Sequence, residues 1–482
     1  MPGVPTYRGC DACQKQKKKC DQASPACARC ARLKIPCIGQ GQLRYKFKEQ
    51  FKSSKSSSKT TQLVHRQAVF QIHKPPPAPL SEIDSLSNRL ISALQVTEPR
   101  YDISALGTWF VEVPQRLGKN ELFDKATAAF VYSIEDLRCG TKVPTLGAIT
   151  WYGKALTSLT TTVQDPAKAK DPYTLASIFM LMVSQSWVAN SADYIRHMEG
   201  VTHLLNASAG EEWDGKFEKL LRFHLTIPAY VESALNPTLQ VHPWYKKQYS
   251  LPYGPYKPLD EDVGQPIESI DIPQLMRYPE LFRDPELHEA ELRKRYNLML
   301  LEAPFLLRRF NLVSNLNKAR IPPDPEMVRC ETQIRLAYAV LVCYALMANG
   351  FLSAMNPLEI FLQEEALQLS KEAIWIAAIS QCDLPIGAGF MPATLFAAWA
   401  ATDDPGVLKG IKRTMVDYRL HWAEWHYVLR FRDLKIRMRN IRDERLTELR
   451  AKGHVGLDVT DFISVDGLEH DWQAYWEEVK AL

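Results

Sequence analysis

The chain lacks the segments and motifs that would assign it to a membrane, a secretory pathway or a familiar enzyme class. Its longest uninterrupted apolar run, Leu336–Ala348, has 13 residues, whereas a membrane-spanning helix needs about 20. Met1–Cys10 has no apolar h-region, so we expect a reducing compartment, where clustered thiols bind metal more often than they form disulfides. No G-x-S-x-G or H-E-x-x-H occurs, and the G-x4-G-K match at Gly210 has Phe217 where a nucleotide site needs a hydroxyl. We therefore expect no enzyme.

Basic residues are concentrated at the N-terminus. Residues 1–59 hold 14 Lys/Arg and 3 Asp/Glu, a net charge of +11, whereas residues 60–482 hold 45 basic and 52 acidic residues, a net charge of −7. A small basic head of this kind suits a polyanion, and a mildly acidic body does not. The apolar fraction of 46% is ordinary for a chain that buries a sizeable core.

Six of the ten cysteines form two identical halves with the pattern C-x2-C-x6-C-x6-C-x2-C-x6-C, at Cys10, Cys13, Cys20, Cys27, Cys30 and Cys37. Zinc takes four ligands in tetrahedral geometry, so one zinc would leave two thiolates idle. Two zinc ions need eight ligand positions, which six cysteines fill only if two sulfurs bridge. Symmetry between the halves selects Cys10 and Cys27 as the bridges. So short a segment cannot fold on an apolar core, and the metal must supply the folding free energy.

The residues between the ligands indicate the partner. The stretch after the second cysteine is long enough for a short helix and contains four lysines, Lys15, Lys17, Lys18 and Lys19. The matching stretch, residues 31–36, is more apolar and less charged, so we expect the first half to face the polyanion and the second to brace it. Residues 10–37 contain no Phe, Tyr or Trp, which favours duplex DNA over single strands, because single strands usually stack on aromatic rings.

This N-terminal region resembles the fungal zinc binuclear cluster transcription factors. The residues that carry the resemblance, within about residues 8–40, are the six cysteines, the four lysines, Asp21 and Pro25. The resemblance implies that a short helix points its C-terminal end into the major groove and that Lys17 reads a CGG triplet. Lysine can donate to guanine O6 and N7, while neighbouring lysines neutralise phosphates. The family usually has Arg or Lys where this chain has Gln14 and Gln16.

We predict a mainly α protein with four segments: a two-zinc, six-cysteine DNA-binding domain (8–40), a flexible basic Ser/Pro-rich linker (41–80), a large all-helical regulatory domain (81–453) and an acidic-aromatic C-terminal tail (454–482). The body weakly resembles the helical regulatory domain that follows the cluster in these factors, most closely over residues 194–201. The strongest expected helices are 120–138, 172–189, 190–206, 286–302, 326–349, 358–380 and 412–451. Residues 236–285 are Pro-rich, and we expect a long surface excursion there.

Two features of the body bear on its role. Ser81 begins a capping-box-like sequence, followed by an apolar stripe that is too short for a zipper, so we expect it to dock on the body. Seven basic residues between Arg430 and Arg445 lie on the expected helix 412–451. We expect them to form a solvated face with acidic partners such as Asp433, Asp443 and Glu444, rather than a second nucleic-acid surface.

The tail has an unusual composition. Residues 454–479 contain no Lys or Arg, and their acidic residues alternate with Phe462, Trp472, Tyr475 and Trp476. This composition suits a coactivator-binding tail, and folding back onto the body fits equally well.

The sequence therefore predicts a nuclear, sequence-specific regulator of RNA polymerase II transcription that binds double-stranded DNA, holds two Zn²⁺ per chain and contacts no membrane. It is compatible with a homodimer, and such regulators often control a pathway, including secondary-metabolite gene clusters. The rival hypotheses are an RNA- or single-strand-binding protein that uses the same basic head, and an enzyme that carries a DNA-targeting finger.

Overall fold

The computed structural model describes two compact units, Met1–Pro76 and Pro77–Leu482, each treated below by itself. The described residues are 9–38, 81–141, 143–188, 194–249, 267–419 and 425–452. The predicted linker, 41–80, and the predicted tail, 454–482, lie outside them.

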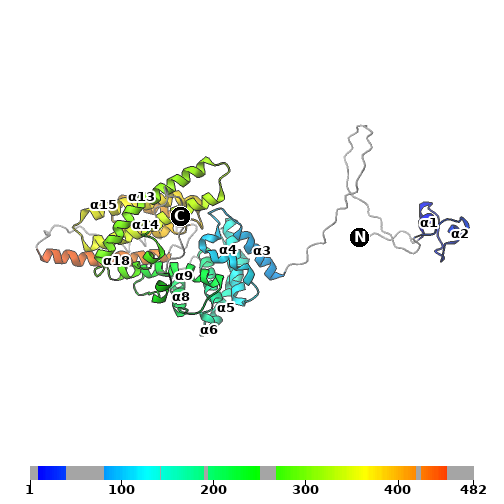
Figure 1. The fold of residues 1–482 in the computed structure, drawn as a ribbon, viewed down its shortest axis with the longest axis horizontal. Coiled ribbons are helices and arrows are strands. Elements are labelled where there is room, and N and C mark those ends of the chain that lie inside the picture. Colours follow the sequence, from blue (N-terminus) through cyan, green and yellow to red (C-terminus); the bar gives the residue numbers. More distant parts are fainter. Residues whose placement is uncertain are drawn as a thin grey trace. The chain divides into compact units, whose positions relative to one another are not determined.

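The second unit is built of helices, and its described residues contain no strand (Figure 1). This confirms the predicted mainly α fold. The principal helices are α3 (Glu82–Leu94), α4 (Glu121–Arg138), α5 (Leu146–Thr162), α7 (Pro172–Val188), α8 (Tyr194–Ala207), α9 (Lys216–Leu235), α13 (Glu289–Ala319), α14 (Pro325–Met355), α15 (Ile360–Ser380), α16 (Met391–Ala401), α17 (Pro405–Arg419) and α18 (Trp425–Ala451).

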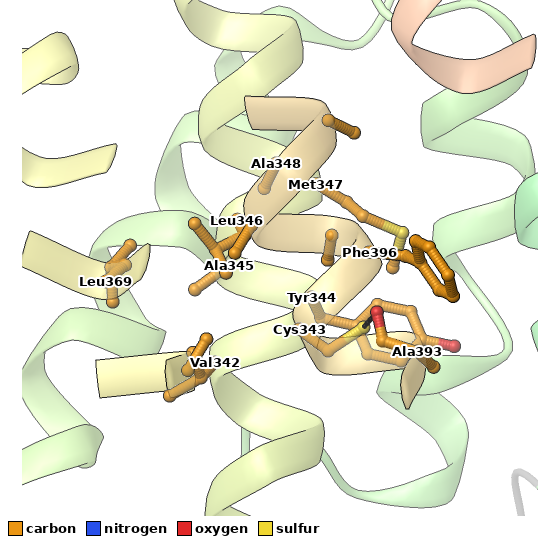
Figure 2. Packing of buried hydrophobic residues seen from close by; sticks show 14 of the residues in the cluster. Val342, Cys343, Tyr344, Ala345, Leu346, Met347, Ala348, Leu369, Ala393 and Phe396 are labelled. Atoms are coloured by element: carbon orange, nitrogen blue, oxygen red, sulfur yellow. Dashed lines mark hydrogen bonds between the residues drawn. The ribbon is translucent and has the colours of Figure 1, made fainter. Parts of the chain in front are cut away.

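Two apolar cores hold this unit together. One lies among α3, α4, α5, α7, α8 and α9, and the other among α13 to α18. Helix α14 is at the centre of the second core, where it packs against α13, α15, α16 and α18. Every residue from Val342 to Ala348 is buried, and Figure 2 shows these side chains packed with Leu369, Ala393 and Phe396. A helix that is apolar on all sides needs partners on all sides, which explains the central position.

The apolar character of α14 reflects this core position. The helix is long and apolar enough to cross a membrane, yet 78% of its most apolar window is buried inside the unit. Cys343 lies in the same region, is 2% exposed and approaches the carbonyl oxygen of Ala393 at 3.8 Å. It is therefore a core residue, as the surrounding sequence indicates.

The first helix of the unit docks on the body, as predicted. Ser81 and Asp84 form a reciprocal capping box at the start of α3, in which the Asp84 N–H donates to Ser81 Oγ at 3.0 Å. Leu86 and Leu90 are buried in the first core, whereas Ile91 is 39% exposed. The stripe is therefore used for packing within the unit.

The prediction of a surface excursion over residues 236–285 is wrong for its described parts. They contain three short helices, α10 (Pro243–Tyr249), α11 (Ile272–Leu275) and α12 (Tyr278–Arg283). Tyr245, Tyr278 and Phe282 are fully buried. Proline is compatible with the first turn of a helix, so these prolines start helices whose aromatic residues anchor them to the body.

Two of the expected helix bounds also differ. Helix α13 continues to Ala319 with Pro304 inside it, well beyond the expected end. The expected helix 412–451 starts earlier, because α17 begins at Pro405, and its described parts are α17 up to Arg419 and α18 from Trp425, with residues 420–424 outside the described residues.

The expectation of a solvated basic face on α18 is wrong for Arg430 and Lys435, whereas Arg432 is 42% exposed and pairs with Asp433 at 3.3 Å, as expected. Arg430 pairs with Glu199 at 2.6 Å and with Glu232, and only 12% of its side chain is exposed. Lys435, whose side chain is 4% exposed, donates to the carbonyl oxygens of Trp399 and Thr402. The partners of Arg430 and Lys435 lie on other elements because α18 packs between helices. The two cations donate to acceptors that would otherwise be buried without a hydrogen bond.

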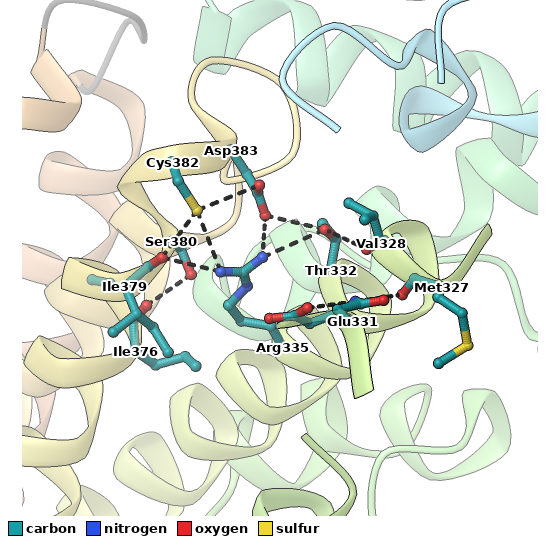
Figure 3. A network of polar contacts seen from close by, with 12 residues as sticks. Met327, Val328, Glu331, Thr332, Arg335, Ile376, Ile379, Ser380, Cys382 and Asp383 are labelled. Carbon is teal, nitrogen blue, oxygen red and sulfur yellow. Dashed lines mark hydrogen bonds and ion pairs between the residues drawn. The ribbon is translucent and has the colours of Figure 1, made fainter. Parts of the chain in front are cut away.

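A further buried ion pair ties α14 to the segment after α15 (Figure 3). Arg335 pairs with Asp383, and the two side chains are 7% and 9% exposed. Arg335 also donates to the carbonyl oxygen of Ile379 at 3.0 Å, and Thr332 Oγ1 donates to Asp383 at 3.1 Å. Such hydrogen bonds offset the desolvation of the buried pair.

Candidate metal centre and nucleic-acid interface

The described part of the first unit is a structural repeat. Its two short helices, α1 (Asp11–Lys15) and α2 (Ala28–Arg32), each begin directly after the first cysteine of a half. Lys17 and Lys34 occupy equivalent positions after the helices and have left-handed backbones, with φ of 52° and 50°. In each half the backbone N–H of the next residue donates to a carbonyl oxygen five residues earlier. Lys18 donates to Cys13 at 2.9 Å, and Ile35 donates to Cys30 at 3.1 Å. This is the Schellman ending of a helix, and it occurs twice.

The repeat brings the six sulfurs into two groups of four. One group is Cys10, Cys13, Cys20 and Cys27, and the other is Cys10, Cys27, Cys30 and Cys37. Within each group all sulfurs lie within 4.8 Å of one another. Both groups contain Cys10 and Cys27, the pair that symmetry selects as bridges.

The sulfur distances fit zinc and exclude disulfides. Cys10 Sγ lies 3.8 Å from Cys27 Sγ and 3.5 Å from Cys30 Sγ, and Cys13 Sγ lies 3.7 Å from Cys27 Sγ. A tetrahedron with Zn–S bonds of about 2.3 Å has sulfurs about 3.8 Å apart. A disulfide would require about 2.05 Å. The six thiols are therefore free and correctly spaced for two four-coordinate ions.

The sulfurs themselves form the centre of this unit. The buried side chains of its described part are Cys10, Cys13, Cys27 and Cys30, each at most 1% exposed. Few apolar side chains pack against them, which is too little to stabilise a fold. Zinc bound to these thiolates would supply the missing free energy.

The backbone favours charge on the two shared sulfurs. The backbone N–H of Cys13 lowers the pKa of Cys10 to about 6, and the N–H of Cys30 lowers the pKa of Cys27. Burial raises the pKa of Cys13 to about 12. Bound zinc replaces the protons of all its cysteine ligands, and backbone N–H groups at the helix starts further stabilise the two shared sulfurs as thiolates.

Three polar contacts hold the loops around the sulfurs. Both carboxylate oxygens of Asp21 accept from the N–H of Ala28, at 3.1 and 3.2 Å, and so cap the start of α2. Arg29 donates to the Gln16 side chain across the two halves. Sequence reasoning missed this contact, because it treated Gln16 only as a departure from the family pattern.

The predicted DNA-contacting lysines lie within the first half of the repeat, between Cys13 and Cys20. Lys15, Lys17, Lys18 and Lys19 are all exposed. Lys15 ends α1, and Lys17 comes two residues later in a left-handed conformation that costs a non-glycine residue roughly 1–2 kcal/mol. A charged side chain is therefore presented where glycine would be the less strained choice.

The comparison with known protein families agrees with this geometry. Residues 8–46 match the fungal Zn(2)-Cys(6) binuclear cluster domain. No curated protein and no solved structure matches the chain significantly. In this domain two zinc ions are held by six cysteines, which corresponds to the two four-sulfur groups described above. Residues 8–46 therefore form a fungal Zn(2)-Cys(6) binuclear cluster domain, the zinc-binding, DNA-binding domain of a family of transcription regulators.

Proposed function

We propose that the chain is a nuclear transcription regulator that reads a CGG-type triplet in duplex DNA through Lys17. Lys15, Lys18 and Lys19 contact phosphates in this proposal. The observation that carries it is the position of Lys17, an exposed lysine directly beyond the C-terminal end of α1.

Physical chemistry supports different roles for these lysines. Side chains within the last turn project sideways from the helix axis, whereas one beyond the last turn can extend along it. An ammonium group there can donate to guanine O6 and N7, which distinguish G·C from the other base pairs in the major groove. Lysines at other angles meet phosphates, which position a protein without reading sequence.

The body contributes regulation rather than DNA affinity in this proposal. Residues 60–482 carry a net charge of −7, and a surface of that sign is repelled by DNA. Dimerisation and effector binding are roles that a helical body of this size can host. In this proposal the protein controls the genes of one pathway. Genome-wide mapping of the DNA sites that it binds tests this.

Lys34 is a matched control for Lys17. It has the equivalent place in the second half, a similar φ and an exposed side chain. We expect Lys17→Ala to lose about 1–3 kcal/mol on a site with the triplet and much less on a site with a mutated triplet. Lys34→Ala should leave the difference between the two sites unchanged. Lys18→Ala should weaken both sites similarly and flatten the log-affinity against log-salt slope by roughly 0.9.

Titration of the full chain on matched and mutated duplexes at several salt concentrations decides between these outcomes. Equal losses on both duplexes for Lys17→Ala would remove its base-reading role and leave four interchangeable counter-charges. Tighter binding to single-stranded DNA or to RNA than to any duplex would favour the rival nucleic-acid function.

A further inference from the structure

Helix α13 exposes an apolar stripe on the side that faces away from the second core. Leu301, Phe305, Leu312 and Leu316, here named the α13 stripe, are 68%, 38%, 45% and 47% exposed. Their spacing of four, seven and four residues places them on one face of the helix. Phe310, on the opposite face, is 7% exposed and packs edge-on against Trp375 of α15. Exposed apolar stripes of this length mark interaction surfaces more often than isolated residues do.

The α13 stripe has a basic border. Lys294, Arg308 and Lys318 are exposed on this helix, and the Arg308 guanidinium lies 4.6 Å from the centre of the Phe305 ring. Glu302, the single acidic residue between Leu292 and Arg320, is buried and accepts backbone N–H groups at 2.8 and 2.9 Å. Between Leu301 and Lys318 the exposed side chains of α13 thus include apolar and basic ones and no acidic one, which calls for an acidic, amphipathic partner.

We propose that this partner is the C-terminal tail of the same chain, through residues 471–479. These residues have large apolar side chains at positions i, i+3, i+4 and i+7, namely Trp472, Tyr475, Trp476 and Val479. That spacing produces one apolar face if the segment docks as a helix, the mode in which amphipathic helices bind apolar surfaces. The acidic residues among them, Asp471, Glu477 and Glu478, complement the basic border.

The tail is long enough to reach the stripe. Near the end of the described chain, Arg445 of α18 donates at 2.8 Å to Glu286, just before α13 begins. Leu301 lies about 18 Å along the helix from Glu289, at 1.5 Å per residue. The 19 residues between Lys452 and Trp472 can span up to about 60 Å.

Other occupants fit less well. A second copy of α13 would bring Arg308 and Lys318 against their own positive charges. The basic residues 41–59 would be repelled for the same reason. Residues 250–266 contain four prolines, which exclude a helically spaced apolar row. A docked tail would also withhold its aromatic residues from other proteins, so release of the tail would control its availability.

Site-specific photo-crosslinking in the full chain tests the proposal. A photoreactive benzoylphenylalanine in place of Trp476 should crosslink to peptides that contain the α13 stripe. We expect Leu312→Glu to lower this yield at least ten-fold, and the double charge change Arg308→Glu with Lys318→Glu to lower it several-fold. Leu146→Glu, at a residue of α5 that is 80% exposed, is the matched control and should leave the yield unchanged.

Mixing isotope-labelled and unlabelled chains separates the remaining possibilities. Crosslinks confined to one isotope form support docking within a chain, and mixed pairs would overturn it in favour of a second copy. Crosslinks elsewhere on the body, none at all, or an unchanged yield for Leu312→Glu would also overturn the proposal. Circular dichroism melting of each variant identifies a misfolded body, and the charge variants then carry the test.

Discussion

The two four-sulfur groups predict that two equally buried cysteines have unequal importance. Cys10 belongs to both groups, whereas Cys13 belongs to one, although the side chains are 0% and 1% exposed. Cys10→Ala and Cys13→Ala remove the same atoms from the same buried cluster. A difference between the variants therefore reports the number of ions that each sulfur binds.

The structure sets the size of the difference. Cys10→Ala leaves three sulfurs in both groups, while Cys13→Ala leaves one group of four intact. A structural zinc site in a zinc-finger peptide contributes about 10–16 kcal/mol at neutral pH. The net stability of a whole domain is about 5–15 kcal/mol, so impairing both sites should unfold this unit. We expect about two zinc ions per chain for the parent, about one for Cys13→Ala and close to none for Cys10→Ala.

Elemental analysis of the purified full chain, after dialysis against a weak chelator, gives these ratios directly. Cys27→Ala should repeat the result of Cys10→Ala, and Cys30→Ala that of Cys13→Ala, because the halves are equivalent. Equal zinc loss in all four variants would refute the shared-ligand assignment. A single zinc in the parent would refute the two-site geometry itself.

Two further predictions concern the helical unit, each followed by urea or thermal unfolding of the full chain. Arg430→Ala should cost about 3–5 kcal/mol, because it leaves the buried Glu232 carboxylate without its cation. Arg445→Ala, in exposed pairs, should cost under about 1 kcal/mol, and equal losses would contradict this reasoning. The hydrogen bond from Arg277 lowers the pKa of Glu291 from 4.5 to about 2. Its contribution to stability is therefore present above pH 4.5 and lost as the pH falls towards 2. Glu291→Gln should flatten the dependence of Tm on pH in that range, and an unchanged slope would exclude the contribution.

The sequence determined the features that depend on neighbouring residues. Cysteine spacing predicted the zinc cluster and the two cysteines that both four-sulfur groups contain, because ligands close in the chain need only short turns to meet one ion. The capping box at Ser81 and the central α14 could be predicted for a similar reason, since caps and apolar periodicity act within a few turns. The position of Lys17 at the end of α1 also follows from its distance to Cys13.

Only the tertiary structure decided which distant residues meet. The acidic partners of Arg430 lie about 200 residues earlier in the chain, and no local sequence pattern distinguishes them from the carboxylates that stay exposed. Tyr278 and Phe282 lie in a proline-rich stretch that resembles a loop, yet both are fully buried. Gln16 bonds to Arg29 only because the repeat folds its halves together. Side-chain partners depend on how the helices pack, and packing is the sum of many contacts between residues far apart in the chain.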